Sequence, residues 1–178
     1  MTNKLINNNR ALGIDYSFLP LQIELVPSTA FGENLRKLLT KTEWDKVRKA
    51  VYKRAGYKCE ICGGKGEKHP VEAHEEWLYH DEIGYQELTV IRALCPNCHL
   101  CKHVGFAIQN NQKARVLNHL CKVNGLTLEQ ANEQIKQAFV IWSKRSLRQW
   151  QLDNKRIDEV RAWANRPPFV AGENPINN

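Results

Sequence analysis

Four of the six cysteines form two Cys-x-x-Cys pairs, a pattern that predicts a metal site. Cys59 and Cys62 make the first pair, and Cys95 and Cys98 make the second, after an interval of 32 residues. Two thiolates on one tight turn can bind the same ion, and two such turns complete the tetrahedron of ligands that zinc prefers. A redox dithiol needs only one such pair. The doubled motif therefore predicts a structural Zn²⁺ site.

Three histidines near these pairs are candidates for a second metal site. His99 and His103 directly follow the second pair, four residues apart. If the chain becomes helical there, both share one face and can chelate one cation. His74, at the end of a predicted short strand between the pairs, is a candidate third ligand. Cys121 lies among apolar residues and is expected in the core.

Hydrophobic periodicity predicts that helices surround this centre. A helix is expected from Thr42, with Thr42 capping toward Asp45, to about Gly56, which suits the position just past a helix end. Three later helices are expected over residues 114–124, 128 to about 151, and 154–165. Residues 21–25 alternate apolar and polar side chains between prolines, which indicates a short strand or an extended arm.

Composition favours a polyanionic partner. Lys and Arg outnumber Asp and Glu by 26 to 19, which gives a net charge of +7. A basic surplus of this kind suits nucleic acid, although a charged helix face is usually just solvated. The residues expected to contact a nucleic-acid backbone are Lys46, Arg48, Lys49, Lys53, Arg54, Lys144, Arg145 and Arg148.

Two further features bear on location. No apolar run approaches the ~18 residues that a membrane span needs. The first ten residues lack the apolar stretch of a secretory signal. We therefore expect no membrane association and a cytoplasmic protein with reduced cysteines.

Over roughly residues 44–105 the sequence resembles the HNH, or ββα-metal, nuclease family. The matching parts are the start of the basic helix, the stretch 54–63 around the first cysteine pair, and the stretch 94–103 around the second. The resemblance implies an α+β fold in which a β-hairpin and a helix surround one divalent ion, with zinc-binding cysteine turns at the ends and flanking helices. It also implies hydrolysis of DNA phosphodiester bonds, in which the ion stabilises negative charge and a base activates water.

The family's first motif aligns with the stretch 71–76, and two registers are open. In the preferred register His74, His99 and His103 hold the catalytic ion, which is Mg²⁺, Mn²⁺, Ni²⁺ or Zn²⁺, and Glu75 takes the base position usually held by histidine. A rival register makes His74 the base and places Ala73 where a ligand is needed. The motif asparagine that usually orients the base falls at Val90, which cannot replace it.

Two functions therefore follow from the sequence. The first is a metal-dependent HNH-type DNA endonuclease, which the three histidines favour. The alternative is an HNH-like zinc module that binds DNA or a protein partner without cleaving, which Glu75 and Val90 favour. We expect an N-terminal arm (residues 1–40), the HNH-like domain with its leading basic helix (41–108), a C-terminal helical extension (109–166) and a tail (167–178). The sequence does not indicate an oligomeric state.

Overall fold

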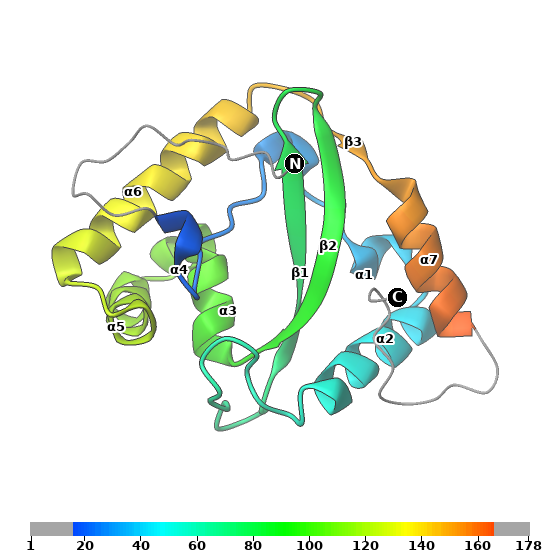
Figure 1. Ribbon diagram of the computed structural model, residues 1–178, viewed down its shortest axis with the longest axis horizontal. Coiled ribbons are helices and arrows are strands. Elements are labelled where there is room, and N and C mark those ends of the chain that lie inside the picture. Colours follow the sequence, from blue (N-terminus) through cyan, green and yellow to red (C-terminus); the bar gives the residue numbers. More distant parts are fainter. Residues whose placement is uncertain (1–15, 166–178) are drawn as a thin grey trace.

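The chain has an α+β fold in the computed structural model, which describes residues 16–165 (Figure 1). The expected tail over 167–178 lies outside these residues. The sheet has the order β1-β2-β3, with β1 (Glu72–His80), β2 (Tyr85–Leu94) and β3 (Gln151–Leu152). The helices are α1 (Leu35–Leu38), α2 (Lys41–Arg54), α3 (Pro96–Lys102), α4 (Val104–Gln109), α5 (Lys113–Asn124), α6 (Leu128–Arg145) and α7 (Asn154–Asn165), with short 3-10 turns at Tyr16–Phe18 and Ser28–Ala30.

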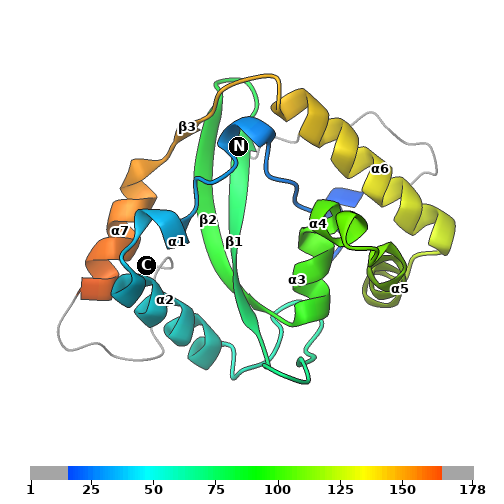
Figure 2. The same cartoon turned by 180° about the vertical axis from the view of Figure 1, so that it is seen from behind.

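The long β1–β2 hairpin divides the described part of the molecule into two sides. Helices α1, α2 and α7 lie on one side, and α3 to α6 lie on the other (Figures 1 and 2). Each side has its own apolar core: Val47 and Val51 of α2 pack with Ile91 of β2 and with α7, whereas Leu94 packs with α3, α5 and α6. Successive strand residues point to opposite faces of a sheet. Neighbours along each strand therefore belong to different sides.

The antiparallel register of the hairpin decides which strand residues face each other. His74 pairs with Arg92, and Glu76 pairs with Val90. A bulge between Glu76 and Trp77 shifts the register beyond that point, and the hydroxyl of Thr89 donates to the carbonyl of Glu76 at 2.9 Å. Thr89, which is adjacent to Val90 at the position expected for the family's asparagine, therefore stabilises the bulge.

Helix α2 begins two residues earlier than the sequence predicted. Thr40 is the N-cap, and it forms a capping box with Glu43, because each side chain bonds to the other's backbone N–H. The predicted Thr42–Asp45 cap is therefore wrong. Two overlapping Thr-x-x-acid patterns occur here, and the glutamate, with its longer side chain, completes the box. The predicted end is confirmed, since Gly56 has φ +58° just past the helix.

The later helices confirm the predicted starts and show one wrong end. Thr127 caps α6 and Gly125 ends α5 with φ +67°, but α6 ends at Arg145 instead of continuing to about residue 151. The indole N–H of Trp150 donates to the carbonyl of Arg145 at 2.9 Å. The chain then pairs Gln151 with Tyr85 of β2. Tertiary contacts end this helix, since no glycine or proline occurs between residues 146 and 150.

Residues 19–26 form the expected extended arm. They lie against the α3 side and add no strand to the sheet of the described residues. The backbone of Leu21 bonds in both directions with the side chain of Asn124, and the N–H of Glu24 donates to the carbonyl of Lys102 at 3.3 Å. These bonds fix the arm beside α3 and bring Glu24 next to the hairpin.

Candidate metal centres

The four paired cysteines come together in one cluster. Their sulfur atoms all lie within 4.8 Å of one another, and the sulfurs of Cys62 and Cys95 are 3.6 Å apart. A tetrahedral ion with ~2.3 Å bonds to sulfur requires sulfur–sulfur distances of about 3.8 Å. The cluster has these dimensions, so it can bind a metal ion such as zinc.

Two differently built turns place these sulfurs. In the first turn, the N–H of Gly63 donates to the carbonyl of Cys59 at 2.9 Å. Gly63 has φ +72°, a conformation that glycine adopts without strain. In the second turn, Cys95 is the N-cap of α3, and its sulfur accepts the N–H of Cys98 at 3.4 Å. The second pair therefore forms the beginning of α3.

The electrostatics of the cluster suit a cation. Hydrogen bonds from the Cys95 and Cys98 thiols hold the pKa of Cys59 far below its usual range. The same interaction raises the pKa of Cys95 to about 11, and it raises the pKa of the fully buried Cys98 as well. One thiolate in the cluster therefore opposes ionisation of the others. A divalent cation removes this conflict because it binds all four as thiolates.

One neighbour of the cluster was not singled out by its sequence position. His119 of α5 places its Nε2 atom 3.1 Å from the sulfur of Cys98. An imidazole N–H in this position donates to a metal-bound thiolate and stabilises its charge. Cys121, in contrast, packs in the apolar core as predicted. Cys101 is also buried there, and its burial raises the pKa of its thiol to about 12.

His74, His99 and His103 form a second cluster, one helical turn after the cysteines. One nitrogen from each ring lies within 4.8 Å of the others. The Nε2 atoms of His99 and His103 face each other at 3.2 Å, close to the ~3.3 Å expected for two nitrogens on one tetrahedral ion. The helical spacing predicted this pair, and the strand brings His74 to within 5.2 Å of both ring centres. The three nitrogens are thus arranged to bind one metal ion.

Carboxylates orient two of the three histidines. Glu72 contacts Nδ1 of His99, and this hydrogen bond, stronger than the opposing effect of burial, lowers the pKa of Glu72 to about 2. Glu24 lies 3.0 Å from Nε2 of His74. An ionised carboxylate accepts the ring N–H, which leaves the other ring nitrogen with a lone pair for a metal. Metal-binding histidines commonly have such partners.

His74 and His103 are held in the neutral form that binds metals. Burial, together with the neighbouring His74 and His99, lowers the pKa of His103 to about 3. Burial also lowers the pKa of His74 despite the opposing hydrogen bond with Glu24. Both imidazoles are therefore uncharged near neutral pH, and a neutral imidazole is the ligand form.

Glu75, which the sequence placed in the base position, does not join this cluster. It is adjacent to His74 on β1 and therefore points to the opposite face of the hairpin. Its two carboxylate oxygens accept the N–H of Leu35, at 3.1 and 3.2 Å. Burial raises the pKa of Glu75 to about 7. The expectation that this carboxylate lies beside the histidines is therefore corrected: it lies at the start of α1.

Five of the eight basic residues expected at a nucleic-acid surface lie on α2. Those on α2 lie across the hairpin from α3 (Figure 1). Lys49, Lys53 and Lys144 are exposed. The other five contact the fold itself: Lys46 the carbonyl of Ala164, Arg48 Asp45, Arg54 Glu60, Arg145 both carboxylate oxygens of Asp81, and Arg148 the Asp81 carbonyl.

Of the two carboxylates that bond to the histidines, the sequence alone could have identified one but not the other. Glu72 is two residues before His74 on one strand, so alternation places both on the same face, and this signal could have identified it. Glu24 is 50 residues from His74, and no local pattern connects them. Only the fold shows that the arm supplies this carboxylate.

Within residues 16–165, no helix combines the length and the apolar character required to cross a membrane. Comparisons with family models, with curated proteins and with solved structures found no match to this chain. The geometry of the two clusters therefore carries the functional argument.

Proposed function

We propose that the protein is a metal-dependent, HNH-type endonuclease that hydrolyses DNA phosphodiester bonds. One observation carries the proposal: a strand histidine and two helix histidines converge on one point, beside a cysteine cluster at the start of the same helix. The cysteines hold structural zinc in this proposal. A purely structural module needs the cysteines but has no need of three converging histidines, two of which have carboxylate partners.

The ligand set suits a reactive ion better than a structural one. Three protein ligands leave coordination positions open, whereas four thiolates close a tetrahedral site. A divalent ion supplies positive charge for the scissile phosphate and lowers the pKa of a bound water molecule. His74, His99 and His103 hold the ion, and Glu72 and Glu24 orient His99 and His74. The proposal assigns no catalytic role to Glu75.

A second candidate function is a zinc-stabilised module that binds DNA or a protein partner without cleaving it. Two observations favour it. Glu75 faces away from the histidines, and Val90 occupies the position of the family's asparagine.

The enzyme hypothesis has a base in the rival register of the motif. There His74 becomes the base, and Glu24 is the carboxylate that orients it.

Plasmid nicking by His103→Ala tests the proposal. Wild-type protein should nick supercoiled DNA with at least one of Mg²⁺, Mn²⁺, Ni²⁺ or Zn²⁺, each added separately. His103→Ala should abolish nicking, because two remaining ligands hold and orient an ion poorly. The cysteine-bound zinc and the circular dichroism spectrum should be unchanged. His80→Ala is the matched control, since His80 bonds to Glu87 near the hairpin turn.

Two results would count against the enzyme. Wild-type protein that nicks DNA with none of the four ions contradicts it and favours the non-catalytic module. Unchanged binding of the second ion by His103→Ala contradicts the histidine site itself. Nicking lost in His74→Ala with ion affinity retained would select the register in which His74 is the base.

A further inference from the structure

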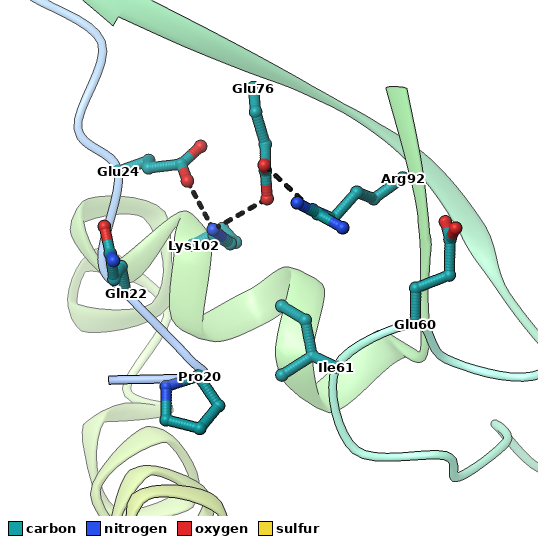
Figure 3. A pocket seen from close by; sticks show the side chains of 8 residues that line it. All are labelled: Pro20, Gln22, Glu24, Glu60, Ile61, Glu76, Arg92 and Lys102. Atoms are coloured by element: carbon teal, nitrogen blue, oxygen red, sulfur yellow. Dashed lines mark hydrogen bonds and ion pairs between the residues drawn. The ribbon is translucent and has the colours of Figure 1, made fainter. Parts of the chain in front are cut away.

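A polar pocket lies next to the histidine cluster, where the arm, the first cysteine turn, the hairpin and α3 meet (Figure 3). Its volume is about 270 Å³. Glu24, which bonds to His74, lines one wall, and Arg92, which pairs with His74 across the hairpin, lines another. The pocket is therefore built partly from the residues that surround the candidate ligand His74.

A buried lysine organises the charges of the pocket. Lys102 is only 2% exposed, and its ammonium group contacts one oxygen of Glu24 and, at 3.1 Å, one oxygen of Glu76. The second oxygen of Glu24 bonds to His74, and the second oxygen of Glu76 lies 2.8 Å from Nε of Arg92. A chain of contacts thus runs from His74 to Arg92, as the sticks in Figure 3 show for its last four members.

The third carboxylate of the pocket is also occupied. Both oxygens of Glu60 accept from Arg54, at 2.9 and 2.8 Å, and one of them also accepts the N–H of Ala93. Each carboxylate oxygen that lines the pocket therefore has a donor. The three carboxylates are paired with three cations: Lys102 and Arg92, which line the pocket, and Arg54, which is not part of its lining.

Of the two cations that line the pocket, Arg92 keeps the larger unused hydrogen-bonding capacity. Its one recorded contact within the described part of the chain is Nε with Glu76, which leaves both terminal amino groups without a partner there. Its side chain is 38% exposed, and the guanidinium borders the pocket (Figure 3). Because the carboxylates are occupied and Arg92 offers only donors, the pocket suits a ligand rich in acceptor oxygens. A guanidinium fork matches the oxygens of a phosphate.

We propose that Arg92 and this pocket form a subsite for a backbone phosphate of a nucleic-acid strand. Glu76, held by Lys102, fixes the Nε side of Arg92 and turns its terminal amino groups toward the phosphate. Arg92 is directly opposite His74 in the hairpin, and residues paired in this way have Cβ atoms about 5 Å apart. A nucleic-acid strand bound to Arg92 therefore passes close to His74. The subsite deepens the proposed nuclease function, since it positions the substrate beside the ion site.

Fluorescence anisotropy of a labelled 12-base-pair duplex measures the subsite directly. The protein carries its cysteine-bound zinc, and no further divalent ion is added, so binding is separated from cleavage. Arg92→Gln should raise the dissociation constant about tenfold, the loss expected for one charged hydrogen-bonding contact. It should lower the slope of log affinity against log salt by about one. The loss should be equal for duplexes of different sequence, because a phosphate contact reads no bases.

Arg156→Gln is a matched control. Arg156 also pairs with a carboxylate, at 2.9 Å from Glu159, and its side chain is 35% exposed, but it lies on α7 across the hairpin. It should change affinity by less than about twofold. Arg92→Lys keeps the charge and loses the fork, so it should fall between wild type and Arg92→Gln. Thermal melting verifies that each variant is folded, and if Arg92→Gln is unfolded, Arg92→Lys decides.

The outcomes separate this subsite from the nuclease proposal. Wild-type affinity in the folded Arg92 variants overturns the subsite, and so does a loss confined to one base sequence. An absence of duplex binding by the wild-type protein overturns it too. If the wild-type protein nicks DNA with none of the four ions and Arg92→Gln still binds DNA more weakly than wild type, the subsite is supported and only the enzyme is contradicted. Normal nicking and binding by Arg92→Gln contradicts only the subsite.

Discussion

The two faces of the β1–β2 hairpin differ in what their polar groups do. On the α3 face, His74 lies beside two further histidines and bonds to Glu24, which also contacts the buried Lys102. On the α2 face, Glu75 is a half-buried carboxylate at the edge of an apolar core, bonded to one backbone N–H. Adjacent residues in sequence thus have entirely different surroundings.

This difference teaches that strand alternation places both candidate metal centres on one face of the hairpin, although each face packs against an apolar core. The α2 face contributes stability through buried apolar surface. The α3 face holds both candidate metal centres on one helix, because Cys95 and Cys98 form its first turn and His99 and His103 follow. The cysteine cluster therefore fixes the helix that carries the histidines. Loss of the first centre should disrupt the second, whereas loss of the second should spare the first.

Cys98→Ser should have the largest effect and tests this asymmetry. The substitution removes a fully buried thiolate ligand, and the binding free energy of a structural zinc, on the order of 10 kcal/mol, is folding free energy. We expect loss of zinc by elemental analysis and loss of the cooperative melting transition. Cys121→Ser, outside the cluster, should keep both. A folded Cys98→Ser protein without zinc would show that the α3 face is stable without its metal.

Glu72→Ala should have an intermediate effect, confined to the histidine centre. Removing a carboxylate that orients a metal-binding histidine typically lowers metal affinity by about 10- to 100-fold. Titration with Ni²⁺ or Zn²⁺, after the cysteine site is filled, measures this change. Glu67→Ala, at an exposed acidic residue before β1, should leave the affinity unchanged. Equal affinities for both variants would mean that Glu72 does not support His99 as a ligand.

Local patterns predicted the parts of this structure that depend on residues close in sequence. The cysteine spacing predicted the four-sulfur cluster, and the i, i+4 spacing predicted that His99 and His103 share a face. Glycine signals predicted the ends of α2 and α5. Each of these features depends on only one turn or one short helix, where sequence and geometry are directly linked.

Long-range packing determined the parts that the sequence did not show. The end of α6 depends on Trp150 and on pairing with β2. The position of Glu24 depends on an arm anchored by Asn124, 103 residues from Leu21. Motif alignment gave the position of Glu75 along the strand but not its face, and the structure places its carboxylate at the start of α1 instead of beside the histidines.

Glu75→Gln should have the smallest effect, and that effect should depend on pH. The pKa of Glu75 rises from 4.5 to about 7 because of burial. A raised pKa means that the folded state disfavours the charged form, so the contribution of Glu75 to stability falls between about pH 4.5 and pH 7 and then levels off. Glutamine stays neutral and still accepts the N–H of Leu35. The variant should therefore match wild type at pH 4 and exceed it at pH 8 by about 1–2 kcal/mol, allowing for partial exposure.

Denaturant unfolding at the two pH values measures this difference, and nicking assays on the same variant examine the function of Glu75. If the α2 face serves packing alone, Glu75→Gln should nick DNA at the wild-type rate. A large fall in rate with unchanged metal binding would instead mean that Glu75 reaches the substrate. That result would restore the base position inferred from the motif, and it would mean that the separation of the two faces fails during catalysis. Equal stability of the two proteins at both pH values would show that burial does not raise the pKa of Glu75.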